Sequence, residues 1–332
     1  MNCDLTYFNR IRSLILILVV VLFTGSSLAQ QESFEFVVLP DTQTYVEEYP
    51  EIYLHQMQWI ANNKDRFSFV LHVGDITQNN SGREWDVAKK GFNIIETKVP
   101  YSFALGNHDM GSESGKFADT RNTSLANAFF SPKDLSNLIT SFPEGKVDNL
   151  LSEFRIGDQK WMVLSLEFGP RNKTIGWAGE MMTKYPEHNF IVNTHAYLFE
   201  DSTLHDGEDW WLPEGYGIGI DTGEEAPNNG GQLWEKLIKK HDNILMVFSG
   251  HILKSGVGTL VSTGEKGNKV YQMLANYQKG VEGSENGGNG FLRIIKVNPK
   301  ENRIEVKTYS PWLNEFMDEK EHNFTFDNVQ LK

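Results

Sequence analysis

Five short polar clusters contain the side chains of this chain that are best suited to holding a metal ion. They are Asp41-Thr42-Gln43, Gly74-Asp75, Gly106-Asn107-His108-Asp109, Thr194-His195 and Gly250-His251. Carboxylate, amide and imidazole groups without thiolates suit Zn, Mn, Fe or Mg. A cation held in this way polarises an ester oxygen and activates a water molecule, so metal-assisted ester hydrolysis is chemistry that such a set can perform.

The clusters share one position relative to the predicted elements, because each follows an apolar run that reads as a β-strand. These runs are residues 34–39, 67–73, 99–105, 190–193 and 244–249. Helices are predicted at 52–62, 84–95 and 232–241, and strands alternating with helices favour an α/β core. Ligands bind at the carboxyl ends of strands in such folds, so the five clusters are expected to converge. Glycines before Asp75, Asn107 and His251 allow sharp turns that aim these side chains.

The rest of the chain is predicted to complete one domain. A strand is expected at 161–166, and the irregular stretch 110–150 is interpreted as a helical insertion near the site. Short strands are predicted at 269–274, 290–297 and 303–309, and the last two are expected to form a hairpin. No linker interrupts this pattern, so residues 30–332 are predicted to form a single domain.

Residues 1–29 are predicted to be a secretory signal peptide. Arg10 and Arg12 precede a short apolar run, and the small residues Ser27 and Ala29 mark a cleavage site. The alternative is an uncleaved membrane anchor, which the short run disfavours because a span needs ~20 apolar residues. The expectation is a secreted or periplasmic protein with no membrane segment after cleavage.

Charge and cysteine content limit the functional classes. The chain has a net charge of −13; residues 1–29 carry +1, so the remainder carries −14. This acidity argues against a nucleic-acid footprint, because phosphate backbones require a basic face. Cys3, the single cysteine, lies in the leader, so any metal site in the remainder must use His, Asp, Glu, Asn or Gln.

One strand-end Asp or His alone has an ordinary explanation, as a helix cap, a turn residue or a structural histidine. Five clusters in order are far more specific. Their order resembles the calcineurin-like metallophosphoesterase superfamily, whose usual pattern is Asp-x-His, Gly-Asp, Gly-Asn-His-Asp/Glu, His and Gly-His-x-His. Gly106-Asn107-His108-Asp109 is the most specific part, and Asp41-Thr42-Gln43 is similar to a branch with Gln in place of the first His.

The resemblance covers residues 34–310 and implies an α/β (α+β) fold, with a β-sandwich core flanked by helices in four layers. It also implies one or two divalent metal ions per chain, bridged by Asp75 when both are present. Asn107, His195 and His251 would complete the ligands of the second metal. Asp41, with Gln43 as a weaker ligand, would hold the first. His108 would protonate the leaving oxygen or steady the transition state, and Asp109 would orient it.

Two departures from the family pattern weaken the first metal position. Gln43 offers a neutral amide oxygen in place of an imidazole, and Leu253 stands where the second His of Gly-His-x-His belongs. Leu253 has no atom that can bind a metal. The first metal is therefore predicted to be weak, labile or completed by another residue, such as Gln272 or Asn276.

The resulting prediction is a secreted enzyme that hydrolyses phosphomonoesters or phosphodiesters through a metal-activated water. Its substrate is expected to be a small-molecule or glycan-linked phosphate ester. One alternative is a non-catalytic or substrate-binding protein that keeps the scaffold with a degraded first metal site. A weaker one is a carbohydrate-processing accessory enzyme.

Two loop regions are candidates for shaping the cleft. Residues 199–231 are acidic and contain Trp210, Trp211 and Tyr216, and long loops of this kind are often functional. These aromatic side chains either stack on a sugar or base or anchor the loop to the core. The glycine-rich stretch 280–290 is also expected to border the cleft.

Overall fold

Fourteen strands, arranged in two sheets, form the centre of the part of the chain that is described. The computed structural model describes residues 33–209 and 211–332, so the predicted signal peptide and Trp210 lie outside the described residues. The strands of the first sheet are β1 (Phe34–Leu39), β2 (Phe67–His72), β3 (Tyr101–Phe103), β11 (Leu292–Asn298), β12 (Arg303–Ser310), β13 (Glu315–Phe316) and β14 (Asn323–Asp327). Those of the second are β4 (Leu138–Ser141), β5 (Leu150–Ile156), β6 (Gln159–Leu166), β7 (Asn189–Thr194), β8 (Ile244–Ser249), β9 (Val257–Thr263) and β10 (Lys269–Ala275).

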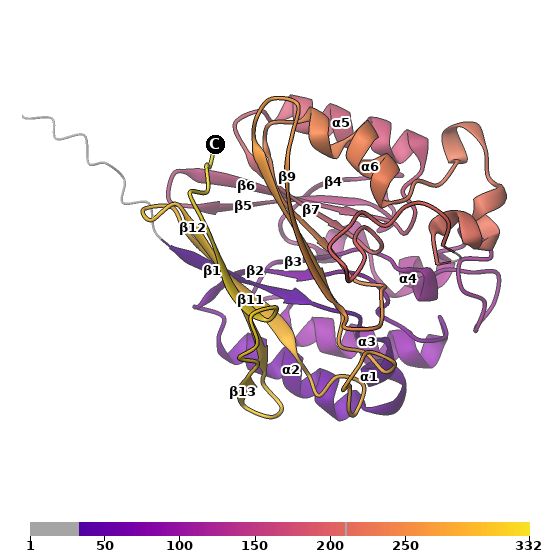
Figure 1. Cartoon of the computed structure of the whole chain (residues 1–332). Coiled ribbons are helices and arrows are strands. Elements are labelled where there is room, and N and C mark those ends of the chain that lie inside the picture. The colour runs from indigo at the N-terminus through magenta and orange to yellow at the C-terminus, as the bar shows by residue number, and fades with distance from the viewer. Residues whose placement is uncertain (1–32, 210) are drawn as a thin grey trace, which may run out of the picture. The chain divides into compact units, whose positions relative to one another are not determined.

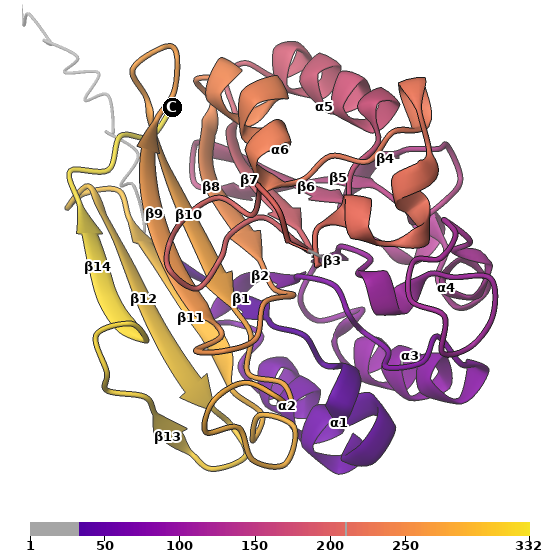
Figure 2. The same ribbon diagram turned by 45° about the vertical axis from the view of Figure 1, so that its right-hand side comes forward.

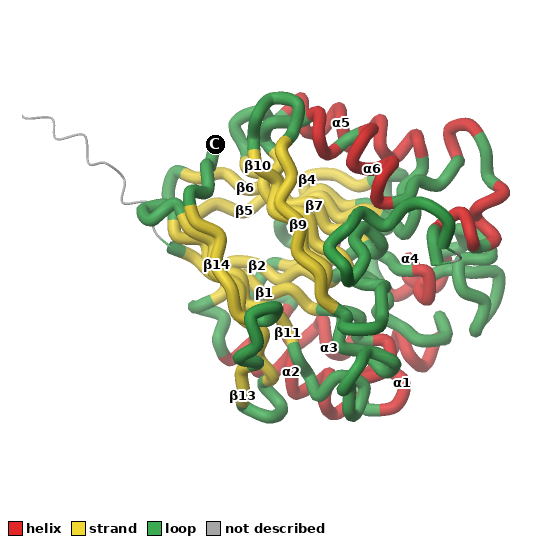
Figure 3. Tube along the Cα trace, viewed as in Figure 1, coloured by secondary structure: helices red, strands yellow, loops and turns green. Residues whose placement is uncertain are grey.

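Each sheet contains a parallel segment beside antiparallel strands. The first has the order β13-β12-β11-β1-β2-β3, with β14 also paired to β12, and β1, β2 and β3 are parallel. The second has the order β4-β5-β6-β7-β8-β10-β9, and β6, β7, β8 and β10 are parallel. Figure 3 shows the strands of both sheets in the middle and the helices on the outside. Parallel neighbours end at the same edge of a sheet, so loops from distant parts of the sequence meet there.

Helices cover the outer faces of both sheets. They are α1 (Gln43–Glu48), α2 (Pro50–Asn62), α3 (Gly82–Ile95), α4 (Ser124–Phe129), α5 (Asn172–Lys184) and α6 (Gly230–Lys236). Figures 1 and 2 show α1, α2 and α3 on the side of the first sheet and α5 and α6 on the side of the second. Proline occupies the first turn of α2, and Ser81 with Glu84 forms a capping box at the start of α3, worth ~1 kcal/mol.

The alternating burial of β1 explains how the layers pack. Phe34, Phe36 and Val38 belong to the apolar cluster between the two sheets, whereas Val37 and Leu39 pack toward the helices of the first sheet. Successive strand residues point to opposite faces, and both faces of β1 are covered. A third apolar cluster joins the second sheet to α5 and α6. The result is a four-layer helix–sheet–sheet–helix sandwich, and the predicted fold is confirmed.

The prediction for residues 110–150 is wrong. This stretch contains the six-residue helix α4 and a 3₁₀ turn at Pro132–Asp134, and it then forms β4, which pairs with β5 at the edge of the second sheet. Its scattered Gly, Ser and Pro residues build turns rather than a helical insertion. Among the residues that the structure describes, no helix has the length and apolar character needed to cross a bilayer.

Candidate metal centre

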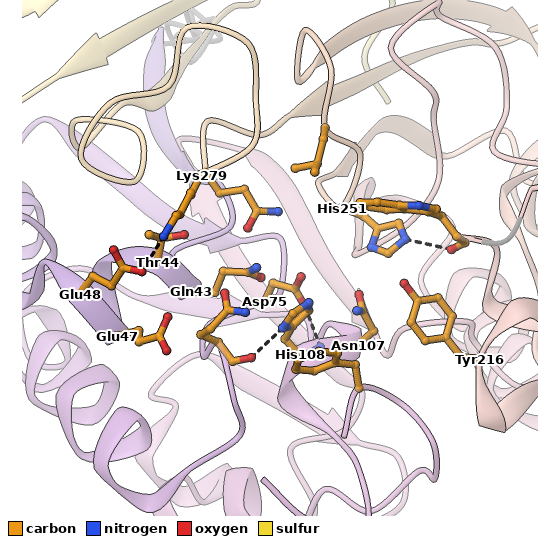
Figure 4. A pocket seen from close by; sticks show the side chains of 15 residues that line it. Gln43, Thr44, Glu47, Glu48, Asp75, Asn107, His108, Tyr216, His251 and Lys279 are labelled. Atoms are coloured by element: carbon orange, nitrogen blue, oxygen red, sulfur yellow. Dashed lines mark hydrogen bonds and ion pairs between the residues drawn. The ribbon is translucent and has the colours of Figure 1, made fainter. Parts of the chain in front are cut away.

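The carboxyl ends of strands from both sheets meet at one cavity of about 560 Å³ (Figure 4). Asp75 follows β2 of the first sheet, and His195 and His251 follow β7 and β8 of the second. One donor atom from each of these three buried residues lies within 4.8 Å of the other two, close enough to share a metal ion. The predicted site residues that line the cavity itself are Gln43, Asp75, Asn107, His108 and His251. Asp41, Asp109 and His195 are fully buried beside it.

Asp75 is held in a strained turn at the centre of the cluster. Its φ of 50° lies in the left-handed region, which non-glycine residues adopt mainly at functional sites and tight turns. A Cβ on Gly106 would lie 2.1 Å from Asp75 Oδ1, so the next loop approaches this carboxylate only as glycine. Asp75 Oδ1 accepts the backbone N–H of His108 at 2.9 Å, and Oδ2 faces Nε2 of His195 at 3.1 Å.

Hydrogen bonds to backbone carbonyls determine which ring nitrogen of His195 and of His251 is free to bind a metal. His195 Nδ1 lies 3.0 Å from the carbonyl oxygen of Val73, and His251 Nε2 lies 2.9 Å from that of Trp211. A carbonyl only accepts, so these nitrogens carry the protons, which leaves His195 Nε2 and His251 Nδ1 to bind a metal. Two ligands of a tetrahedral Zn²⁺ at about 2.1 Å would lie about 3.4 Å apart. His195 Nε2 and Asp75 Oδ2 are 3.1 Å apart, so small side-chain shifts would let both bind one ion.

The amide oxygen of Asn107 provides a fourth donor for this position. Asn107 begins a 3₁₀ turn directly after Gly106, and its Oδ1 is buried with no hydrogen-bond partner among the described residues. Burying an oxygen without a donor is costly, and a cation would remove that cost. The structure therefore brings together Asp75, Asn107, His195 and His251, the four residues expected around the second metal. Their role as ligands stays a prediction.

The buried carboxylates of the cluster also favour the binding of a cation. Burial lowers the pKa of His195, but the carboxylates of Asp75 and Asp41 outweigh it and raise that pKa to about 9. Burial alone would raise the pKa of Asp75, whereas His195 and His108 hold it below its ordinary value. Asp41 is the opposite case, because burial raises its pKa to about 8 despite the nearby His195. Two carboxylates in one buried cluster are stabilised together when a divalent ion supplies the positive charge.

Around the first metal position, the structure shows oxygen atoms without partners. Asp41 Oδ2 accepts the backbone N–H of His251 at 3.0 Å, but its Oδ1 has no partner among the described residues. A Cβ on Gly250 would lie 1.9 Å from that Oδ1, so only glycine leaves room for it. The side-chain oxygen of Gln43, at the start of α1, is also buried without a partner in the described part.

Gln272 and Asn276, the two residues suggested as replacements for the missing histidine, both have their side chains engaged in other hydrogen bonds. Gln272 Oε1 accepts the hydroxyl of Tyr197 at 2.5 Å, and its Nε2 donates to Ser262 Oγ at 2.8 Å. Asn276 Nδ2 donates to the carbonyl of Ile252 at 3.2 Å, and its Oδ1 accepts the backbone N–H of Gln278. The side chain of Gln272 joins β10 to β9 and to Tyr197, and that of Asn276 joins the loops after β8 and β10, so neither fits as the replacement. The expectation that the first metal is weak or labile stays a prediction.

His108 is oriented by partners that were not anticipated. Its Nδ1 lies 2.6 Å from the carbonyl oxygen of Gln78, and its ring stacks on Phe117 with 3.9 Å between ring centroids. Asp109, predicted as the orienting partner, instead accepts backbone N–H groups of Ile76, Thr77 and Gly106 at 2.8–3.0 Å. Burial and the charge of Asp75 raise the pKa of Asp109 to about 6. Asp109 therefore joins the loops after β2 and β3 and does not orient the ring of His108.

The family comparison agrees with this geometry. The family model "Calcineurin-like phosphoesterase" matches residues 34–255, more than half of the chain. The chain belongs to the calcineurin-like phosphoesterase family. The matched stretch contains all five polar clusters, and the strands after it, β9 to β14, complete both sheets.

One curated protein and one solved structure are similar to this chain. The "Uncharacterized protein YvnB" of Bacillus subtilis (strain 168) is 26% identical over 293 residues, which cover 86% of this chain and 20% of that protein. The chain thus spans about a fifth of the length of this relative. The purple acid phosphatase PPD1 from yellow lupin (Lupinus luteus) seeds superimposes with a TM-score of 0.57 at 14% identity, over 90% of this chain and 54% of that one. At this identity the likeness concerns the fold.

His205, a buried histidine next to the candidate metal centre, was not singled out from the sequence. His205 is fully buried, and neither ring nitrogen has a hydrogen-bond partner among the described residues. Its ring centroid lies 5.6 Å from that of His251, and burial lowers its pKa to about 4. His205 lies in the acidic loop 199–231, where a histidine among acidic residues was the available signal. The same loop places Trp211 and Tyr216 on the cavity wall.

The glycine-rich stretch was expected to border the cleft. The residues just before it, Gln278 and Lys279, line the cavity, whereas Gly280 packs against Leu253.

Proposed function

We propose that this chain is a metal-dependent phosphoesterase that hydrolyses small phosphomonoesters or phosphodiesters. One observation carries the proposal: Asp75, His195 and His251 present donor atoms within 4.8 Å of one another, and the ring of His108 lines the same cavity. Family membership supports the same chemistry. We further propose that Asp41-Thr42-Gln43 places the chain in a branch of the family with Asp-x-Gln at the first cluster.

Different residues around the cavity would serve different steps of hydrolysis. Bound divalent ions would polarise a phosphoryl oxygen and lower the pKa of a water molecule. His108 would serve the leaving group. With its Nδ1 proton bonded to the carbonyl oxygen of Gln78, the ring can donate a proton from Nε2 to a leaving oxygen only as an imidazolium. Phe117 holds the ring in place by stacking.

The walls of the cavity suggest which substrates fit. Phe117, Trp211 and Tyr216 form aromatic surface on which a planar group or a sugar can stack. Figure 4 shows Glu47, Glu48 and Lys279 across the cavity from Tyr216. Lys279 is paired with Glu48 at 2.8 Å. The rim therefore carries net negative charge, which favours a substrate with one phosphate over a polyphosphate.

A metal-supplemented substrate panel tests this function. The chelator-treated protein should be inactive, and added Mn²⁺ or Zn²⁺ should restore hydrolysis of p-nitrophenyl phosphate or bis-p-nitrophenyl phosphate. We expect kcat/KM for AMP to exceed that for ATP by roughly tenfold, about 1.4 kcal/mol, because of the acidic rim. Full activity in a strong chelator would contradict the proposal. A protein that is loaded with metal and binds the esters without turnover would instead support the non-catalytic binding alternative.

We also propose that the protein is exported and that residues 1–29 are removed, leaving one domain of residues 30–332. The positive, apolar and small-residue regions of this segment support the proposal. When the full chain is produced in a secretion-competent bacterium, N-terminal sequencing of the periplasmic or secreted product should begin at Gln30. Ala29→Arg should block cleavage. An intact N-terminus in the membrane fraction of the unaltered protein would show an anchor instead.

A further inference from the structure

The two metal positions of the centre differ in the kind of donor atom they offer. The second position has two imidazole nitrogens, from His195 and His251, next to the Asp75 carboxylate. At the first position the family pattern supplies two further histidines, but this chain has Gln43 and Leu253 there. Leu253 lines the cavity with an aliphatic side chain, so it contributes no ligand.

Two buried oxygen atoms are nevertheless left without partners at the first position. Asp41 is 1% exposed and Gln43 is 5% exposed, and neither Asp41 Oδ1 nor Gln43 Oε1 accepts a hydrogen bond from any described residue. Buried oxygen atoms that receive no hydrogen bond are stabilised when a cation binds them. Gln43 lines the same cavity as Asp75, the carboxylate that is expected to serve both positions (Figure 4).

A third oxygen donor comes from a residue outside every recognised cluster. Gln278, in the loop after β10, is 5% exposed and lines the same cavity as Gln43 and Asp75. Its Nε2 lies 3.4 Å from Asp41 Oδ2, and its backbone N–H is fixed by Asn276 Oδ1 at 3.0 Å. Rotation of the amide by half a turn places Oε1 where Nε2 now lies, so this side chain can offer an oxygen to a cation bound by Asp41.

We propose that Asp41, Gln43, Asp75 and Gln278 form an oxygen-only cation site that prefers Mg²⁺, Ca²⁺ or Mn²⁺ to Zn²⁺. Hard cations prefer carboxylate and amide oxygens, whereas Zn²⁺ gains more from imidazole nitrogen. The centre is then a mixed one, with a nitrogen-rich position that keeps its metal and an oxygen-only position that exchanges it. The proposal rests on the metal centre of the proposed function, but its test measures metal binding and does not require turnover.

Sequential loading of the full chain separates the two positions. The metal-free protein is first given one equivalent of Zn²⁺ and dialysed, and its metal content is measured. Mn²⁺ is then titrated in and bound Mn²⁺ is followed by electron paramagnetic resonance. We expect one retained Zn²⁺ per chain and one weaker Mn²⁺, which excess Ca²⁺ or Mg²⁺ displaces more effectively than additional Zn²⁺ does.

Substitutions then test the individual ligands. Gln278→Ala should weaken Mn²⁺ binding by roughly tenfold or more and leave the retained Zn²⁺ at one per chain. Gln58→Ala removes the same amide from an exposed position of α2 and should change neither. The double variant Gln43→His with Leu253→His restores the imidazoles of the family pattern and should retain two Zn²⁺ per chain.

Each outcome decides between the alternatives. A second Zn²⁺ that binds the unaltered protein more tightly than Mn²⁺, or unchanged Mn²⁺ affinity in Gln278→Ala, would overturn the oxygen-only site. If Gln278→Ala proves poorly folded, Mn²⁺ affinity can be measured in Gln278→Glu instead, because an added carboxylate should tighten Mn²⁺ binding. A protein that retains no Zn²⁺ at all would contradict the proposed function itself, so the two failures are distinguishable.

Discussion

Asp75→Asn is expected to abolish metal-dependent hydrolysis, with a fall in kcat/KM of roughly 10³-fold or more, about 4 kcal/mol. Asp75 is the carboxylate whose Oδ2 faces His195 Nε2 at 3.1 Å, and it is the residue expected to serve both metal positions. An amide offers one oxygen and no charge. The metal content after dialysis should therefore fall below one ion per chain.

The same variant should remain folded, which separates loss of metal from loss of structure. Asparagine keeps the shape of the side chain, its oxygen can still accept the backbone N–H of His108, and its NH₂ can donate to His195 Nε2. The change also removes a negative charge that raises the pKa of the buried Asp41. The melting temperature in the presence of a chelator should thus be equal to or higher than that of the unaltered protein.

A surface carboxylate provides the matched control for this prediction. Asp158→Asn makes the same chemical change in the exposed turn between β5 and β6, at the start of β6 and away from its carboxyl end. It should leave rate, metal content and the metal-induced rise in melting temperature unchanged. If Asp75→Asn kept its metal and a near-normal rate, the assignment of the centre would be wrong.

Local patterns in the sequence were sufficient to predict several strands and helices of an α/β core, whereas the four-layer arrangement was predicted from the family resemblance. The apolar runs of β1 and β8 begin and end where the structure has them, because both strands are buried on both faces and are bounded by turn residues. The hairpin of β11 and β12 was predicted from the turn residues between them, Asn298 to Asn302. Strands with mixed burial were missed, including β9, β13 and β14, because their solvent-facing side chains interrupt the apolar pattern.

For the candidate site, too, the residues that follow a local pattern were predicted, and those that only the folded chain brings together were not. The strand-end rule placed Asp75, His195 and His251 together, since it needs only the ends of parallel strands. Gln278 and His205 could not be found in this way, because a glutamine or histidine in a loop has no characteristic spacing. Only the folded chain brings Gln278 to Asp41, which is 237 residues away in the sequence.

Asp109 shows a different difficulty. Its position in the motif correctly predicted that it lies close to the site, but not what its carboxylate binds. It lies next to His108 in the sequence, yet its carboxylate turns toward the backbone of the loop after β2. The orientation of His108 comes from a carbonyl and an aromatic ring, and neither partner has a sequence signature.

His108→Gln is expected to slow hydrolysis in a way that depends on the leaving group. General acid catalysis contributes roughly 10²–10⁴-fold, and its value grows as the leaving oxygen becomes more basic. The variant should therefore lose roughly 10²-fold or more in kcat with alkyl phosphate esters. It should lose much less with p-nitrophenyl esters, whose leaving group departs without a proton.

The metal content distinguishes this role from that of a ligand. His108 Nδ1 is bonded to Gln78 and its ring is stacked on Phe117, and the residue is absent from the group of donor atoms around Asp75. His108→Gln should consequently retain as much metal as the unaltered protein, in contrast to Asp75→Asn. His55→Gln, at an exposed position of α2, is the matched control and should change neither metal nor rate. An equal loss of rate with alkyl and p-nitrophenyl esters would show that His108 stabilises the phosphoryl group in the transition state and does not protonate the leaving oxygen.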